Sequence, residues 1–248
     1  MTIPIGIQLY SLKRETSKDF LGTLKALATM GYDGVEFAGY GGIAAPAMKT
    51  HLDSLGLKVA GSHADITVLT TQLGEQMDYN LTLGNRNMVC SWSDCKTEAD
   101  FLRLAEKLTH VGEKLRDVGM TLSYHNHAHE FVDLGGRCGM DILQQHTDAA
   151  LLSFEVDLYW VKHAGLDPLD YVKTLGPRAL LLHCKDMNDE PDQKSTELGS
   201  GLIDFSPIVF YAQTSGTQWL IVEQETFVHY TPIESARIGL EHLRQISN

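Results

Sequence analysis

The sequence predicts a single-domain α/β protein, a closed (β/α)8 TIM barrel that spans residues 1–248. Short segments rich in Val, Ile, Leu and Phe alternate with longer segments of helical spacing, which indicates parallel strands joined by right-handed crossovers. Eight such units fit into 248 residues, close to the usual length of this barrel. The first strand ends in QLYSLKRE and lacks the glycine fingerprint typical of a doubly wound open sheet.

The predicted elements follow one another with short connections. Strands are expected at 3–10, 34–37, 58–63, 87–92, 121–127, 151–160, 179–186 and 219–225. Helices are expected near 17–30, 44–56, 70–84, 97–119, 136–147, 168–176, 204–216 and 232–246. Helix 97–119 has the clearest pattern, because apolar residues from Phe101 to Leu115 recur at steps of three and four. Thr97 is its expected N-cap, and Gly119 its expected end.

The composition is that of an ordinary globular protein, with 43% apolar and 21% charged residues. Its 32 acidic and 20 basic side chains give a formal net charge of −12, which disfavours a nucleic-acid partner. Four scattered cysteines without a C-x-x-C pair are expected to be reduced thiols. We expect a cytoplasmic protein without a signal peptide or membrane helix, and a homo-oligomer stays open.

Polar side chains collect at the carboxyl ends of the predicted strands. They are Gln8, Glu36, His63, the 125–130 cluster, Asp157, His183 with Lys185, and Glu223 with Glu225. The carboxyl-terminal mouth of this barrel is where active sites lie. The sequence therefore predicts a functional site at the mouth.

Strands 6 to 8 contribute the strongest candidates for a metal site. Asp157 lies within the apolar FEVDLYW, His183 follows ALLL, and Glu223 follows WLIV. A carboxylate inside an apolar strand costs several kcal/mol unless it is paired or bound to a metal. Two carboxylates with imidazoles suit Mn²⁺, Co²⁺, Zn²⁺ or Mg²⁺, and nothing in the sequence selects among these ions.

The stretch YHNHAHEF, residues 124 to 131, places three histidines and a glutamate within eight positions. Side chains alternate along a strand, so His125 and His127 are expected to face the lumen while Tyr124 and Asn126 face outwards. His129 is expected past the strand end, in solvent. Glu130 either folds back over the mouth or caps the following loop.

Taken in order, several motifs resemble the xylose-isomerase-like TIM barrels, usually called sugar phosphate isomerases/epimerases. They are GYDGVEFAGYGG, YHNHAHEF, DLYWVKHAGLDP, LLHCKD, ELGSGLIDF and WLIVEQE, and they span essentially the whole chain. The resemblance implies one divalent metal held by residues of strands 5 to 8. Carried over, three ligands are Asp157, His183 and Glu223. On strand 5, His125 stands where many relatives have glutamate, and Glu130 is the alternative ligand.

The resemblance also implies proton abstraction next to a carbonyl, with a metal-stabilised enediolate. His127 and Glu130 are the candidate bases, and Lys185 is expected to stabilise the developing oxyanion. The remaining candidates for substrate binding are Gln8, Glu36, His63, Trp92, Trp160 and Glu225.

The first functional hypothesis is a metal-dependent isomerase or epimerase of a small sugar or keto-sugar. A lyase or hydrolase acting on oxidised (3-keto) glycosides or cyclitols is the second. The third is a sugar-binding barrel without turnover. A nuclease ranks last, because of the net charge and because Trp160 stands where several relatives have a second histidine.

Overall fold

The computed structural model describes residues 2–247 and forms a closed barrel of eight parallel strands. Around the barrel the strand order is β1, β10, β7, β6, β5, β4, β3, β2. The barrel strands are β1 Ile5–Gln8, β2 Gly34–Phe37, β3 Lys58–Ala64, β4 Asn87–Cys90, β5 Thr121–His125, β6 Ser153–Asp157, β7 Ala179–Cys184 and β10 Trp219–Val222. The predicted fold class is confirmed.

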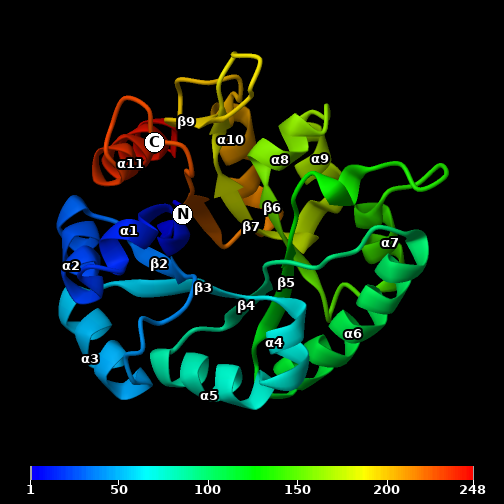
Figure 1. The fold of residues 1–248 in the computed structure, drawn as a ribbon, viewed down its shortest axis with the longest axis horizontal. Helices are drawn as coiled ribbons and strands as arrows, with labels where there is room; N and C mark the ends of the chain where they lie inside the picture. The colour runs from blue at the N-terminus through cyan, green and yellow to red at the C-terminus, as the bar shows by residue number, and fades with distance from the viewer. Residues whose placement is uncertain (1, 248) are drawn as a thin grey trace.

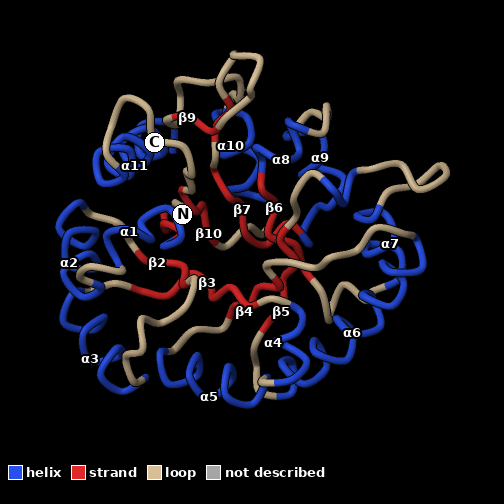
Figure 2. The backbone as a smooth tube through the Cα atoms, in the orientation of Figure 1, coloured by secondary structure: helices blue, strands red, loops and turns tan. Residues whose placement is uncertain are grey.

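Helices surround the strands as an outer ring, as Figures 1 and 2 show. They are α1 Lys13–Thr16, α2 Phe20–Met30, α3 Ala45–Leu55, α4 Ile66–Thr71, α5 Leu73–Leu83, α6 Glu98–Asp117, α7 Gly139–His146, α8 Leu158–His163, α9 Pro168–Leu175, α10 Phe205–Ser215 and α11 Pro232–Ser247. Short 3-10 turns occur at η1 Leu9–Leu12, η2 His129–Phe131 and η3 Gly176–Arg178. A small hairpin after β7 pairs β8 Asp186–Met187 with β9 Ser195–Thr196.

Several barrel strands end earlier than the sequence pattern predicts, because their last polar residues start helices. Gln8 ends β1 and accepts a hydrogen bond from the Tyr10 N–H, which begins η1. Asp157 ends β6 and accepts from the Trp160 N–H at 3.0 Å, so 158–160 belong to α8 and not to the predicted strand 151–160. The predicted helix 70–84 is divided at Gln72 into α4 and α5.

Helix α6 has the predicted caps and buried stripe. The Thr97 hydroxyl accepts from the Asp100 N–H at 3.2 Å, and the Asp100 carboxylate accepts from the Thr97 N–H at 2.9 Å, which completes a capping box. Gly112 lies on the buried face, where a β-carbon would collide with the Leu151 carbonyl oxygen. The glycine thus allows close packing of the helix against the segment that precedes β6.

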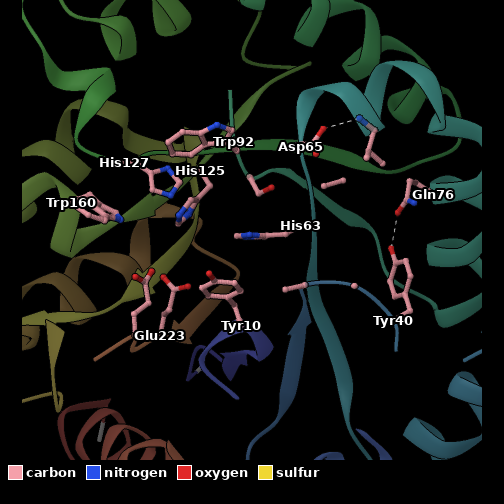
Figure 3. Close-up of a pocket in the computed structure, with 16 residues that line it drawn as sticks. Tyr10, Tyr40, His63, Asp65, Gln76, Trp92, His125, His127, Trp160 and Glu223 are labelled. Atoms are coloured by element: carbon pink, nitrogen blue, oxygen red, sulfur yellow. Dashed lines mark hydrogen bonds between the residues drawn. The ribbon is translucent and has the colours of Figure 1, made fainter. Parts of the chain in front are cut away.

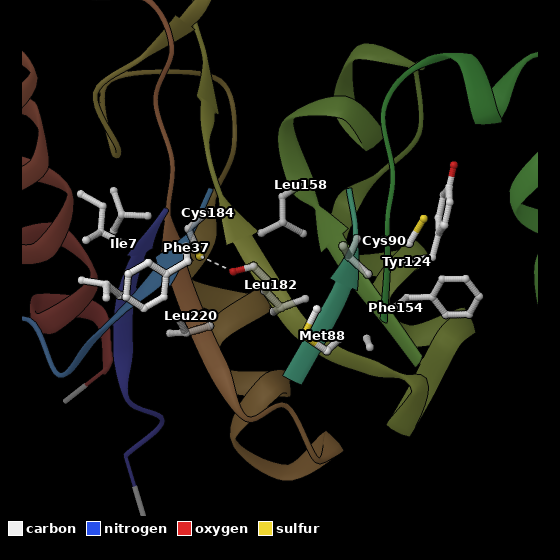
Figure 4. Packing of buried hydrophobic residues seen from close by; sticks show 14 of the residues in the cluster. Ile7, Phe37, Met88, Cys90, Tyr124, Phe154, Leu158, Leu182, Cys184 and Leu220 are labelled. Carbon is white, nitrogen blue, oxygen red and sulfur yellow. Dashed lines mark hydrogen bonds between the residues drawn. The ribbon is translucent and has the colours of Figure 1, made fainter. Parts of the chain in front are cut away.

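Two apolar layers hold the barrel together. The larger fills the space between strands and helices and includes Phe37, Leu182 and Leu220 (Figure 4). The smaller, which we call the floor, is a separate buried apolar cluster: Ala60, Val89, Leu180, Leu181, Trp219 and Ile221. Two residues further along β7 and β10 the same faces become polar, at His183 and Glu223. The apolar floor therefore supports a charged mouth.

Candidate metal centre and pocket

A pocket of about 750 Å³ lies at the carboxyl ends of the strands, where the fold class places active sites. Figure 3 shows His125, His127 and Trp160 on one side and Tyr40 with Gln76 on the other. The location at the barrel mouth agrees with the distribution of polar residues in the sequence.

Barrel register brings the predicted metal ligands together. Asp157 on β6 pairs with His183 on β7, and His183 also pairs with Ile221 on β10. Glu223 follows β10 and lies next to His183. One ligand atom from each of four buried residues, His125, Asp157, His183 and Glu223, lies within 4.8 Å of the others. These are the four residues predicted as ligands. Their use as ligands remains a proposal.

The chemistry of this cluster fits a cation. Asp157 Oδ2 is buried and accepts no hydrogen bond from the residues that the structure describes, and Glu155 Oε1 and Glu36 Oε1 nearby are in the same condition. Burying an acceptor without a donor costs free energy, and a bound cation would remove that cost. Two imidazoles and two carboxylates are donors that Mn²⁺, Co²⁺ or Zn²⁺ accept readily.

Glu155 is a mouth residue that the sequence interpretation missed. Its Oε2 lies 2.6 Å from His63 Nε2, 3.0 Å from His125 Nδ1 and 3.2 Å from His183 Nε2. These four residues form a second candidate metal cluster, which shares His125 and His183 with the first. The signal was present in FEVD, because Glu155 precedes Asp157 by two residues and so occupies the same face of an apolar strand.

Gln8 and Glu36, predicted as substrate-binding residues, do not border the pocket. Both are fully buried, and the Gln8 amide donates to Glu36 Oε2 at 2.8 Å. The same oxygen lies 2.6 Å from His183 Nε2. A β-carbon at Gly61 would collide with the Glu36 carboxylate, so this glycine gives the acid its space. Glu36 therefore holds the His183 ring in place from below the pocket.

Charges in this network stabilise one another. Burial would raise the pKa of Glu36, but His63 and His183 beside it lower it overall. Burial would likewise lower the pKa of His63, yet the carboxylates of Glu36 and Glu155 raise it to about 10. The pKa of Asp157 is raised to about 7, chiefly by burial and against the pull of Lys185. A cation beside Asp157 would offset the effect of its burial.

Each member of YHNHAHEF has a distinct position. His125 and His127 both border the pocket, as the two-residue period predicts. Tyr124 packs into the outer apolar layer (Figure 4). Asn126 ties β5 to β6, because its side-chain oxygen accepts from the Asp157 N–H at 3.0 Å. His129 is partly buried and lies 3.1 Å from the Ser93 carbonyl oxygen, so the expectation that it would be in solvent is wrong.

Glu130, predicted as catalytic base or alternative ligand, lies neither at the pocket nor in either candidate metal cluster. Its carboxylate is fully buried and accepts from the Tyr124 hydroxyl at 2.8 Å and from the His127 N–H at 2.7 Å. The 3-10 turn η2 folds it back against its own strand. Glu130 braces the loop that carries His127.

His127 is a neutral imidazole in the pocket wall. Its Nδ1 is buried and has no hydrogen-bond partner among residues 2–247. Burial lowers the pKa of His127 to about 3, so the ring is neutral at neutral pH. Trp92, which is 46% exposed, meets it edge-on at 4.8 Å between ring centroids, and Trp160 lies 5.8 Å away. The two indoles thus flank the imidazole in the pocket.

Lys185 is a buried cation beside the first cluster. Its Nζ lies 2.7 Å from Glu225 Oε1, 3.6 Å from Glu223 Oε2 and 3.9 Å from Asp157 Oδ2. It also lies 5.1 Å from the centroid of the Trp160 ring. Burial would lower the pKa of Lys185, but the three carboxylates raise it further, so the ammonium stays charged. Glu225 borders the pocket and pairs with this lysine.

These features define a xylose isomerase-like barrel with a polar mouth. The chain belongs to the xylose isomerase-like TIM barrel family, whose model matches residues 24–246. Inosose dehydratase from Lacticaseibacillus casei is 30% identical over 146 residues, which are 52% of this chain and 48% of that protein. The chain therefore spans about half the length of the curated relatives it matches.

Solved structures agree with this family. A sugar phosphate isomerase/epimerase from Parabacteroides distasonis ATCC 8503 superposes with a TM-score of 0.85 at 25% identity, over 98% of this chain and 93% of that one. An L-ribulose 3-epimerase shares the fold with a TM-score of 0.77 at 16% identity, over 99% of this chain and 94% of that one. None of the helices described here combines the length and apolar character that a membrane span needs.

Proposed function

We propose that this protein is a divalent-metal-dependent isomerase or epimerase of a small sugar or keto-sugar. The observation that carries the proposal is that a buried cluster of two carboxylates and two imidazoles reaches the pocket through His125 and Glu223. His127, a neutral imidazole with an unpartnered nitrogen, borders the same pocket. A metal held by His125, Asp157, His183 and Glu223 would supply polarisation of the substrate's carbonyl or hydroxyl oxygens.

In this proposal the chain's own groups move the proton and hold the sugar. His127 removes the proton from the carbon next to the carbonyl and returns it, to another carbon in isomerisation or to the opposite face in epimerisation. The Lys185 ammonium, buried beside Glu223 and Glu225, stabilises through its charge the oxygen on which negative charge develops. Trp92 and Trp160 pack against the apolar faces of the sugar and exclude water. Glu130 keeps the His127 backbone in position.

A lyase is the second candidate, and a specific observation favours it. The curated relatives reported above are inosose dehydratases, although they match only 52% of this chain. Proton abstraction next to a carbonyl is also the first step of an elimination, so the same groups would serve. After that step, loss of a β-substituent from a keto-cyclitol or a 3-keto glycoside would replace reprotonation.

We further propose that the barrel acts as one cytoplasmic domain on small molecules and not on nucleic acid. The supporting observations are the net charge of −12 and four cysteines that form no disulfide among the described residues. A thiol reagent should titrate four thiols in denatured, unreduced protein. Fewer than four would contradict the reduced state.

The function is tested by metal analysis followed by exchange in D₂O. Purified protein loaded separately with Mn²⁺, Co²⁺, Zn²⁺ or Mg²⁺ is incubated with a panel of keto-sugars and keto-cyclitols. We expect about one equivalent of metal and deuterium at the carbon next to the carbonyl of a keto-sugar. Release of water from a cyclitol, with no isomerised sugar, would favour the lyase. Exchange that proceeds equally after removal of the metal by a chelator would contradict metal dependence.

A further inference from the structure

The pocket extends well beyond the candidate metal cluster. His125, Glu223 and Trp160 border one end, whereas Tyr40 and Gln76 border the other (Figure 3). The volume of about 750 Å³ lies in the range of pockets that bury a drug-sized ligand, roughly 300–1,000 Å³. The space therefore exceeds what a single sugar ring fills.

The far end of the pocket is rigid. The Tyr40 hydroxyl donates to Gln76 Oε1 at 2.9 Å, accepts from the Asn80 amide at 2.8 Å and lies 2.8 Å from Ser62 Oγ. The Tyr40 ring also stacks on Tyr79, with centroids 3.8 Å apart. Four contacts thus fix one aromatic side chain in a surface loop, and a fixed wall loses little conformational entropy when a ligand binds.

This end also offers polar groups that the protein does not use. Gln76 Oε1 is occupied by Tyr40, but its amide nitrogen has no hydrogen-bond partner within residues 2–247. Asp65 accepts from the Val68 N–H through Oδ1, and its other oxygen has no donor in the same part of the chain. An amide donor and a carboxylate acceptor suit the hydroxyl groups of a sugar. Trp92 lies beside His127, with ring centroids 4.8 Å apart, and presents an exposed indole to the pocket (Figure 3).

We propose that the substrate is a two-ring glycoside and not a free monosaccharide. The reacting ring lies at the metal cluster, and the second ring lies toward Tyr40 with its hydroxyls on Gln76 and Asp65. The assignment of the reacting ring rests on the proposed function. The second subsite rests on the length of the pocket and on its unused polar groups.

The test compares keto-disaccharides with the ketose that they contain. Isothermal titration of the Mn²⁺-loaded protein measures the affinity for fructose, lactulose, maltulose and isomaltulose, and for glucose, maltose and cellobiose as the aldose series. We expect at least one disaccharide to bind ten times more tightly than its monosaccharides. If no disaccharide binds more tightly than its component rings, the second subsite is wrong.

Two variants test whether the preference for a disaccharide arises at the Tyr40 and Gln76 end of the pocket. Val68→Trp fills the pocket beside Asp65, and Gln76→Ala removes the free amide. Each variant should lower the affinity for the disaccharide to about the affinity for a single ring. The affinity for monosaccharides should change less than twofold. Thr67→Trp is the matched control, because Thr67 lies on the same helix α4, is exposed and does not border the pocket. Should Val68→Trp unfold, Gln76→Ala still gives the test. Equal loss for both ligand classes would contradict the subsite.

The two proposals fail in different ways. Deuterium exchange into fructose without a preference for disaccharides would overturn the subsite and leave the proposed function intact. Tight disaccharide binding without deuterium exchange, whichever metal is loaded, would overturn the proposed function and leave the subsite intact. If neither class of sugar binds, both proposals are wrong.

Discussion

The floor and the mouth of this barrel are built from the same strands yet have opposite chemistry. Leu181 on β7 and Ile221 on β10 belong to the apolar floor. Two positions later on the same faces are His183 and Glu223, buried among charged groups. The difference shows that a single strand can supply packing at one end and reactive groups at the other, because the barrel register aligns both layers around the lumen.

The two layers also differ in what they contribute to stability. Each fully buried apolar side chain in the floor stabilises the fold by about 1.5–3 kcal/mol relative to exposure. Each buried ion in the mouth costs several kcal/mol before its partners compensate. The mouth contains Asp157 Oδ2, which has no donor in the described chain. We therefore expect mouth substitutions to remove function without loss of stability, and floor substitutions to do the reverse.

The largest expected effect follows Asp157→Asn. The amide keeps an oxygen to cap α8 through the Trp160 N–H, but it removes the charge that faces the cluster. Bound metal should fall below one-tenth of an equivalent, and deuterium exchange should be abolished. The melting temperature of the metal-free protein should stay the same or rise, because a buried charge is lost. Metal analysis and thermal unfolding measure both.

Glu155→Gln is the matched comparison for that variant. Glu155 lies on the same strand, β6, as Asp157 but belongs to the other candidate metal cluster. Glu155 contacts His125 and His183, so its loss should weaken metal binding about 10- to 100-fold, as for a residue that orients ligands. If Glu155→Gln abolishes metal binding while Asp157→Asn retains a full equivalent, the metal lies in the His63, His125, Glu155, His183 cluster instead.

Sequence patterns predicted most of the barrel because its physical basis is repetitive. Alternating segments, glycine at helix ends and the Thr97 cap depend on local chemistry, and each of the eight predicted strands overlaps a barrel strand. Strand ends were less predictable. Whether Asp157 extends a strand or starts a helix depends on a hydrogen bond to Trp160, which spacing alone does not reveal.

The structure brings the predicted site residues together where the two-residue period continues to the last strand residue, and not beyond it. His125, Asp157 and His183 end or nearly end their strands, so their direction follows from the pleat. Glu130 comes after a turn, and its direction depends on the Tyr124 hydroxyl that it meets in three dimensions. Glu36 follows the strand pattern but lies too deep to border the pocket. Its depth is set by the barrel geometry and not by the two-residue period of the strand.

The next effect in size follows His127→Asn. The substitution keeps a polar side chain between Trp92 and Trp160 but removes the proton acceptor. Turnover should fall about 10²-fold or more, the usual contribution of a general base, while the metal content stays at one equivalent. His129→Asn, on the same loop but outside the pocket, should stay within a few-fold of the unchanged protein. Normal turnover of the His127 variant would remove this residue from the mechanism.

Floor substitutions should give the opposite pattern. Leu181→Ala leaves a cavity beneath the mouth, because Leu181 is fully buried between β6 and β10. The free energy of unfolding should decrease by about 2–5 kcal/mol, as for other buried Leu→Ala changes. The folded fraction should still bind one equivalent of metal. Urea denaturation and metal titration of the same sample separate the two quantities, and a loss of metal with unchanged stability would contradict the division of layers.

The smallest expected effect lies outside the barrel, at Thr97→Ala. The hydroxyl accepts from the Asp100 N–H, so its removal leaves one helix N–H of α6 to water and breaks half of the capping box. The free energy of unfolding should decrease by about 1 kcal/mol. The cap is exposed, so water replaces the lost contact without moving β5 or the pocket. Metal affinity and turnover should therefore match the unchanged protein when measured at equal folded concentration. A tenfold change in either would show that the helix ring and the mouth are coupled, and would limit the division of roles to the strands themselves.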